Sequence, residues 1–121
     1  MTVLDELVRQ GFGPVTEWVI KGAKIGPRTF DWPDHGGWLY AFVIDGDVKY
    51  IGLTDRVLRS RMSDYSHIKN SQTDRIRELI LEALVSGERV EVFGRRERDK
   101  TVLIAEEARL RGLYRPSWNR V

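Results

Sequence analysis

The chain has 121 residues, which is enough for one domain and too few for two of ordinary size. It contains no cysteine, which excludes disulfide bridges, thiolate zinc sites and a cysteine nucleophile. Its 20 basic and 18 acidic residues leave a net charge of +2, so the totals alone do not indicate a nucleic-acid partner. The N-terminal sequence MTVLDELVRQ is acidic and amphipathic, unlike a signal peptide, and no apolar run approaches the ~20 residues of a membrane-spanning helix. We therefore expect a soluble, cytoplasmic protein.

The N-terminal section, residues 1–37, predicts a helix and a loose hairpin. Thr2 is a good N-cap for the helix, and Gly11 is a stop signal. The expected elements are, in order, a helix over residues 2–10, a strand over 16–20, a second strand over 23–30 that Gly26-Pro27 interrupts, and a loop over 31–37. We expect this section to be an extension laid against the main sheet.

Residues 38–52, WLYAFVIDGDVKYIG, carry the signal around which the rest of the chain is organised. Residues 38–44 and 48–51 are two runs rich in aromatic and β-branched residues, as strands are. The Asp45-Gly46 pair between them is typical of a tight β-hairpin, and Gly52 is expected to end the second strand. Each strand carries one tyrosine, so the hairpin is where we look for chemistry.

The remaining residues predict three helices, one further strand and a docked tail. The expected elements are a helix over residues 56–65 capped by Thr54 or Asp55, a helix over 75–85 capped by Thr73 or Asp74, a strand over 89–93, a charged loop over 94–100, a helix from 101 that Pro116 ends, and a tail over 117–121 in which Trp118 docks. With the hairpin, the strand over 89–93 gives a small central three-stranded antiparallel sheet flanked by helices. This is an α+β fold within the broad α/β class.

Many of the basic residues are arginines, and they fall into three clusters. The planar fork of arginine suits contacts to phosphate oxygens, although a solvated protein surface is an equally ordinary explanation for any one cluster. The clusters are Arg56, Arg59 and Arg61; Arg95, Arg96 and Arg98; and Arg109, Arg111, Arg115 and Arg120.

Taken in order, several of these residues form a pattern. The order is WLY, about ten residues, YIG, the segment Leu58-Arg59-Ser60-Arg61 with Tyr65 after it, Glu107 on a late helix, and a P-x-W-N ending. This pattern resembles the GIY-YIG nuclease family over about two thirds of the chain. The resemblance implies a nuclease-like domain over residues 38–121, with residues 1–37 as the extension packed on it.

The resemblance also implies site residues. The family's positions fall on Tyr40, Tyr50, Arg61, Tyr65, Glu107 and Asn119, with Gly52 closing the second motif. In the family, the first tyrosine is usually the general base, the arginine is catalytic, and the glutamate binds the metal, here Mg²⁺ or Mn²⁺. Singly, each residue has an ordinary structural explanation, such as strand packing, a solvated helix surface or backbone capping. Glu106 is also a rival of Glu107 for the metal.

The chemistry of phosphodiester hydrolysis explains why such residues are needed. A carboxylate can hold a Mg²⁺ ion that keeps most of its waters, and an arginine fork can bind the non-bridging oxygens of the transition state. A nearby positive charge lowers the pKa of a tyrosine, so we expect a lowered pKa for Tyr40 as the base. Tyr50 would orient the water or the phosphate.

We expect further contacts to the nucleic acid outside this set. The expected residues are Arg56, Arg59, Arg95 and Arg96 for phosphates, together with Gly52 and His67. The sequence departs from the family pattern at Trp38-Leu39, which replaces Gly-Ile, and at Leu53, where many relatives carry lysine or a small hydroxyl residue. The leucine at position 53 indicates either slower catalysis or that another residue, such as Lys49 or His67, takes the place of the missing lysine.

These observations favour a metal-dependent endonuclease that acts on DNA. The alternative is a nucleic-acid-binding module of the same fold that cuts weakly or not at all, and a scaffold without a nucleic-acid role is a third interpretation. No added recognition domain is visible, so a homodimer or a partner protein is expected to supply any sequence specificity.

Overall fold

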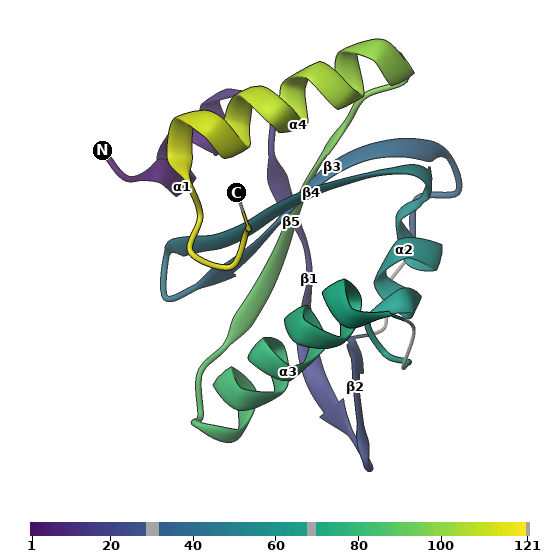
Figure 1. Cartoon of the computed structure of the whole chain (residues 1–121), viewed down its shortest axis with the longest axis vertical. Helices are drawn as coiled ribbons and strands as arrows, with labels where there is room; N and C mark the ends of the chain where they lie inside the picture. Colours follow the sequence, from purple (N-terminus) through teal and green to yellow (C-terminus); the bar gives the residue numbers. More distant parts are fainter. Residues whose placement is uncertain (29–31, 68–69, 121) are drawn as a thin grey trace.

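The computed structural model describes residues 1–28, 32–67 and 70–120, and within these ranges it contains one antiparallel sheet and four helices (Figure 1). The elements are α1 (Val3–Arg9), β1 (Gly13–Lys21), β2 (Lys24–Pro27), β3 (Gly36–Ile44), β4 (Asp47–Val57), α2 (Leu58–Asp64), α3 (Ser71–Val85), β5 (Val90–Arg96) and α4 (Lys100–Tyr114). The expected α+β class is confirmed. Within the described ranges, no helix is long and apolar enough to cross a membrane.

The sheet has five strands in the order β2-β1-β5-β3-β4, so the expected three-stranded sheet is wrong. Strand β1 pairs with β5 from Gly13 opposite Gly94 to Trp18 opposite Val90, and β2 pairs with the outer side of β1. The N-terminal hairpin therefore continues the sheet, and is not laid against it. The physical reason is that β5 would otherwise present an unpaired edge of N–H and C=O groups, which β1 satisfies.

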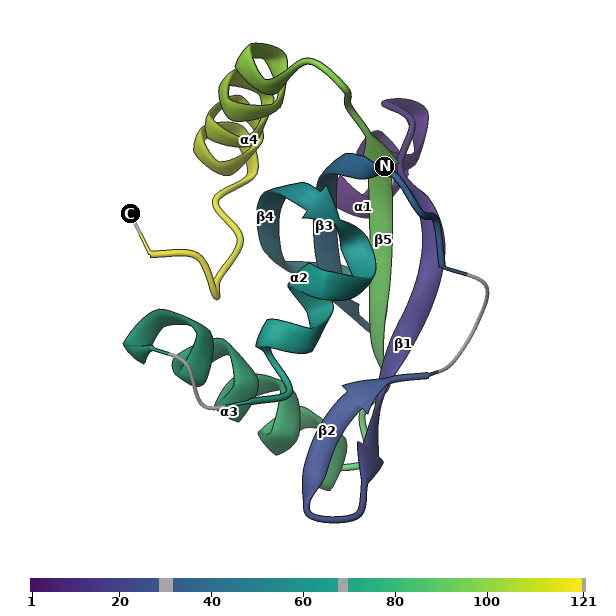
Figure 2. The same ribbon diagram turned by 90° about the vertical axis from the view of Figure 1, so that its right-hand side faces the viewer.

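The two faces of the sheet are both covered, which explains the unbroken apolar run in β3. Helices α2 and α3 cover one face, and α1 and α4 cover the other (Figures 1 and 2). Because side chains alternate along a strand, Tyr40 and Tyr50 point into the core under α2 and α3, whereas Leu39 and Ile51 point into the core under α4. The predicted tyrosines and the helix that carries Glu107 thus lie on opposite faces.

The tyrosine hairpin forms as predicted, but its second strand is longer. The turn at Asp45 and Gly46 is confirmed, and both residues have positive φ angles of 50° and 76°, as two-residue hairpin turns require. Strand β4 does not end at Gly52 and continues to Val57, so Thr54 is a buried strand residue and not a helix cap. Helix α2 consequently begins at Leu58, without a side-chain cap.

Two other boundaries differ from the prediction. Helix α3 begins at Ser71 because the Asn70 side chain accepts hydrogen bonds from the backbone of Gln72 and Thr73. Strand β5 extends through Arg96 because it pairs with β3 as far as Trp38, so the expected loop is shorter. Residues 29 and 30 of the expected second strand, residue 31 of the expected loop and residue 121 of the tail lie outside the described residues.

The C-terminal tail docks on the edge strand β4, as its tryptophan predicts. The Trp118 N–H donates to the Lys49 carbonyl at 2.8 Å, and Arg75 of α3 donates to the Trp118 carbonyl at 2.6 Å. The Asn119 side chain both accepts from the Ile51 N–H and donates to the Ile51 carbonyl, each at 2.9 Å. The tail therefore covers part of a sheet edge that would otherwise be unpaired.

Candidate active site

Three of the predicted site residues form a hydrogen-bonded cluster at the C-terminal end of α2. Arg61 donates from Nε to the Tyr40 hydroxyl at 2.9 Å and from a terminal nitrogen to the Tyr65 hydroxyl at 3.0 Å. The two hydroxyls lie 2.8 Å apart, and one donates to the other. The other terminal nitrogen of Arg61 donates to Asp64 at 3.2 Å.

Local sequence explains how α2 delivers the arginine to the sheet. Leu58, Met62 and Tyr65 face the core at helical spacing and are fully buried, which fixes the rotation of the helix. Arg61 lies beside this apolar stripe, so its guanidinium reaches the buried Tyr40 hydroxyl while part of the side chain stays accessible. Its guanidinium also lies over the Tyr65 ring, 4.8 Å from the ring centre.

Gly52 is the residue that makes room for Tyr40. The two residues are opposite each other in β4 and β3, and a Cβ atom at position 52 would lie 2.6 Å from the Tyr40 hydroxyl and from its Cζ atom. Real side chains do not approach this closely, so the third residue of YIG is a glycine because the Tyr40 ring lies against its backbone. Gly52 is itself buried, which places it away from the surface where a nucleic-acid contact was expected.

The expected pKa of Tyr40 is corrected by its surroundings. Burial raises the pKa of the Tyr40 phenol, and the neighbouring Tyr50 raises it further. The positive charge of Arg61 and the hydrogen bonds with Tyr65 and Arg61 act in the opposite direction but are weaker. The pKa of Tyr65 is also raised, mainly by burial, so the protein's own groups keep both phenols neutral at pH 7.

Glu107 lies apart from this cluster, on the wall of a cavity of about 680 Å³ between α4 and the tail. Its carboxylate accepts one long hydrogen bond of 3.4 Å from Arg111. The cavity is lined by Glu107, Ala108, Arg111, Gly112, Arg115, Pro116, Ser117, Asn119 and Arg120. Asn119 lines the cavity and also holds the backbone of Ile51, the residue between Tyr50 and Gly52.

The neighbouring Glu106 is committed to other partners. It accepts hydrogen bonds from Arg109, the shortest at 2.8 Å, and from both terminal nitrogens of Arg95 at 3.3 Å. The hydrogen bond from Arg109 is the main cause that lowers the pKa of Glu106 to about 2. Of the two adjacent carboxylates, Glu107 is therefore the one with capacity for a further ligand.

The donor set is compatible with a single-carboxylate metal site. Within residues 1–28, 32–67 and 70–120, no group of three or more histidine, aspartate or glutamate side chains is placed to hold a metal ion. Mg²⁺ commonly keeps several waters and binds through one or two carboxylates together with substrate phosphates. Glu107 on an accessible cavity wall is suited to binding Mg²⁺ in this way, whereas the described residues do not form a cage of several protein ligands.

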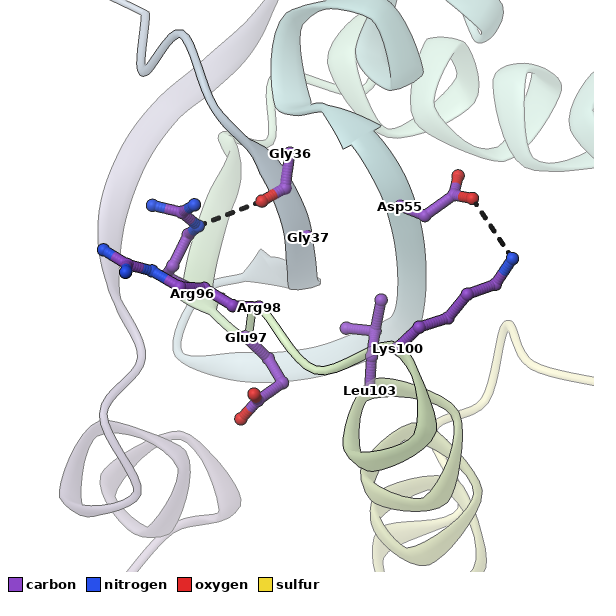
Figure 3. A pocket seen from close by; sticks show the side chains of 8 residues that line it. All are labelled: Gly36, Gly37, Asp55, Arg96, Glu97, Arg98, Lys100 and Leu103. Carbon is purple, nitrogen blue, oxygen red and sulfur yellow. Dashed lines mark hydrogen bonds and ion pairs between the residues drawn. The ribbon is translucent and has the colours of Figure 1, made fainter.

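The arginines expected to contact phosphate differ in how they are held. Arg56 pairs with Asp64, and Arg95 pairs with Glu106 and also donates to a backbone carbonyl. Arg96 donates from Nε to the Gly36 carbonyl at 3.0 Å, on the wall of a groove where Lys100 extends to the opposite side (Figure 3). These contacts commit most of the expected cations to holding the fold.

Two expected contacts lie on the surface. Arg59 is exposed on α2, and among the described residues it has no ion pair. His67 is exposed, has its Nδ1 3.0 Å from the Ser63 carbonyl, and lines a hollow beside the β1–β2 turn. His67 therefore lies toward β2, at the opposite edge of the sheet from β4.

Sequence reasoning missed Asp64 as a partner of Arg61. Asp64 accepts hydrogen bonds from Arg61 and Arg56, and together these lower the pKa of its carboxyl group although burial acts against them. The spacing of three residues between Arg61 and Asp64 on one helix is the signal that could have revealed this pair.

No family model and no curated protein matches the sequence. Solved structures do match: a mutant of bacteriophage T4 EndoII has a TM-score of 0.77 at 23% identity, covering 97% of this chain and 98% of that chain. The restriction endonuclease Hpy188I, in complex with product DNA, has a TM-score of 0.58 at 16% identity, covering 100% of this chain and 84% of that chain.

The chain has a GIY-YIG-like nuclease fold. These matches confirm, for the fold, the resemblance drawn from the motifs. Sequence identities of 23% and 16% support a shared fold only. The match to EndoII spans almost the whole chain, so it includes N-terminal strands as well as the motif-bearing segments.

Proposed function

We propose that this protein is a metal-dependent endonuclease that hydrolyses phosphodiester bonds in DNA. The observation that carries the proposal is the Tyr40, Arg61 and Tyr65 cluster, in which a partly buried guanidinium is held in place by two phenol groups. A packing role alone does not require a partly buried cation to be fixed in this way, because removing a charge from water is costly. The fold shared with two endonucleases supports the same conclusion.

Arg61 is proposed to bind the scissile phosphate. A guanidinium has five N–H donors, and three of them bond to Tyr40, Tyr65 and Asp64. One donor on each terminal nitrogen remains, and such a pair can bind two non-bridging phosphate oxygens. Because the other three donors hold the fork in place, the guanidinium needs little reorganisation when charge develops on the phosphate.

Tyr40 is proposed as the general base, with Tyr50 beside it to orient the attacking water. The two rings lie 6.2 Å apart on the same face of the sheet. A neutral phenol must lose its proton before it can accept one from water, so the raised pKa of Tyr40 makes this the difficult step. The phenolate would be stabilised by Arg61, whose Nε already donates to this oxygen.

Glu107 is proposed to hold Mg²⁺ or Mn²⁺ through its carboxylate. When bound, the ion would stabilise the negative charge that develops on the phosphoryl and leaving oxygens. Asn119 is proposed as a positioning residue and not a catalytic one, because both ends of its amide are bonded to the Ile51 backbone. Through these bonds it holds the strand that carries Tyr50 against the wall of the Glu107 cavity.

The second candidate function is a DNA-binding module that cuts weakly or not at all. The observation that favours it is the raised pKa of Tyr40, which leaves the proposed base protonated at neutral pH. Leu53 adds to this, because it supplies no charge that would help to deprotonate the base.

The deciding experiment is cleavage of plasmid DNA with Mg²⁺ or Mn²⁺ by wild type, Arg61→Ala and Glu107→Ala. Arg28→Ala is the matched control, because Arg28 lies beside β2 at the opposite edge of the sheet. We expect cleavage by wild type and the control, and a loss of about 100-fold or more in either site variant. Equal activity of wild type and both site variants would reject the nuclease, and retained salt-dependent DNA binding would then favour the binding module.

A further inference from the structure

The cavity that contains Glu107 also gathers three arginines at the C-terminal end of α4. Arg111, Arg115 and Arg120 all line it, against the single carboxylate of Glu107. Its volume of about 680 Å³ far exceeds the ~30 Å³ that one water molecule takes up, so a phosphodiester group and its hydration fit within it. The cavity is therefore suited by charge and by size to an anion larger than a single inorganic ion.

The three arginines are not equivalent. Arg111 donates to Glu107 at 3.4 Å and to the Arg120 carbonyl at 2.6 Å, which fastens the tail to α4. Arg115 and Arg120 are exposed, and within the described ranges neither forms an ion pair. The cavity thus has one arginine that builds its wall and two whose guanidinium groups have no acidic partner in the described part of the chain.

The backbone at Arg115 is unusual for an arginine. Its φ and ψ angles of 45° and 60° are left-handed, a conformation that favours glycine at the end of a helix. This conformation ends α4 and turns the chain back, so that Pro116, Ser117, Asn119 and Arg120 line the cavity. Because Arg115 takes a backbone conformation that glycine would adopt more easily, its presence there suggests that the arginine side chain has a function.

The cavity adjoins the proposed catalytic residues through Asn119. Asn119 lines the cavity and is bonded to Ile51, which is next to Tyr50 in β4. Glu107 is on the same wall. An anionic group in this cavity is therefore beside Glu107, the proposed metal ligand, and close to the strand edge that carries Tyr50.

We infer that this cavity is a second phosphate-binding site, in which Arg115 and Arg120 hold a backbone phosphate of bound DNA next to the phosphate that is cut. The inference rests on the proposed function for the identity of the ligand. Arginine forks at fixed positions suit phosphodiester oxygens, and a neighbouring phosphate held in place would orient the scissile one for attack. Arg111 keeps the tail, and with it Arg120, in position.

The first test measures binding of a fluorescent DNA duplex in Ca²⁺, so that binding is separated from cleavage. The variant carries Arg115→Asn and Arg120→Ala, because asparagine tolerates left-handed backbone and the Arg120 carbonyl that Arg111 needs is retained. We expect the Kd to rise about tenfold and the slope of log K against log salt to fall by ~0.9 for each phosphate that the variant no longer neutralises. Arg28→Ala, which removes one exposed arginine at the other sheet edge, is expected to leave the Kd and the salt slope nearly unchanged.

The second test locates the phosphate. A series of duplexes, each with one neutral methylphosphonate, is bound by wild type and by the double variant. We expect a methylphosphonate at one position beside the cut to weaken DNA binding by wild type. The same substitution should not weaken binding by the variant further, because the variant no longer has the two arginines that bind this phosphate. Identical responses of the two proteins at every position would overturn the inference.

The outcomes separate this inference from the proposed function. If wild type does not cleave DNA, but one methylphosphonate weakens binding by wild type and not by the double variant, the nuclease is rejected and the second site is supported. Normal cleavage with no coupling rejects only the second site, and absence of any DNA binding by wild type rejects both. If the double variant loses its circular dichroism spectrum, Arg120→Ala alone carries the test, since it removes no backbone hydrogen bond and changes no helical residue.

Discussion

The packing of Tyr40 against Gly52 gives the sharpest prediction. In Gly52→Ala, the new Cβ would lie 2.6 Å from the Tyr40 hydroxyl and Cζ atoms, so the ring must move. Moving it separates the hydroxyl from Arg61 and from Tyr65, at 2.9 and 2.8 Å. Overpacking costs ~1–3 kcal/mol, and each buried hydrogen bond left unmade costs ~1–3 kcal/mol. We therefore expect the free energy of unfolding to fall by at least ~3 kcal/mol, the sum of the lower limits for overpacking and for the two hydrogen bonds, and cleavage to be lost.

The assay is urea denaturation of wild type, Gly52→Ala and a control, Gly13→Ala. Gly13 is also a strand glycine, but no atom lies within 4 Å of a Cβ placed there. The control is expected to change the free energy of unfolding by less than ~1 kcal/mol. A Gly52→Ala protein as stable as the control would refute the reasoning, because the Tyr40 ring would then not be held against the glycine backbone.

Three further predictions concern the tail, Glu106 and the base. Asn119→Ala leaves the Ile51 N–H and C=O without their partner, so we expect ~1–3 kcal/mol lower stability by denaturation, and unchanged stability would mean that the tail does not hold β4. The pKa of Glu106 is lower in the folded protein than its ordinary value of 4.5, so this carboxylate stabilises the folded protein at pH values above 4.5. The contribution is lost as the pH falls from there toward about 2. Acid titration of Glu106→Gln should therefore show a weaker loss of stability than wild type over that range, whereas equal losses would contradict the assignment. Burial raises the pKa of Tyr40, so cleavage should increase with pH through the neutral and alkaline range, and a plateau below about pH 8 would exclude Tyr40 as an unassisted base.

Local patterns were sufficient for the parts of the fold that depend on neighbours in the chain. The Asp45-Gly46 turn was predicted because few residues adopt the positive φ angles that it needs. The stripe of Leu58, Met62 and Tyr65 predicted which side of α2 faces the sheet. The spacing of Tyr40, Arg61 and Tyr65 was recognised as a set, and they do lie together.

Long-range pairing could not be predicted from the same patterns. Strand β1 contains Gly13, Pro14 and Glu17, which weaken its strand signal, and it joins the sheet because β5 needs a partner on that side. Likewise, Glu106 and Glu107 are adjacent and alike in sequence. Only the positions of Arg95 and Arg109 in space decide which carboxylate is already bonded.

The amino-acid sequence by itself determined the hairpin, the helices, and the set of residues to consider, because turns and amphipathic stripes depend on residues close together in the chain. The tertiary structure decided the five-stranded sheet, which of the two adjacent glutamates is bonded to Arg95, and which arginines at the tail have no acidic partner within the ranges that the structure describes. It also decided the direction of the Tyr40 pKa, because burial by distant segments outweighs the nearby charge of Arg61. These properties depend on which groups meet across the fold, and spacing along the chain does not contain that information.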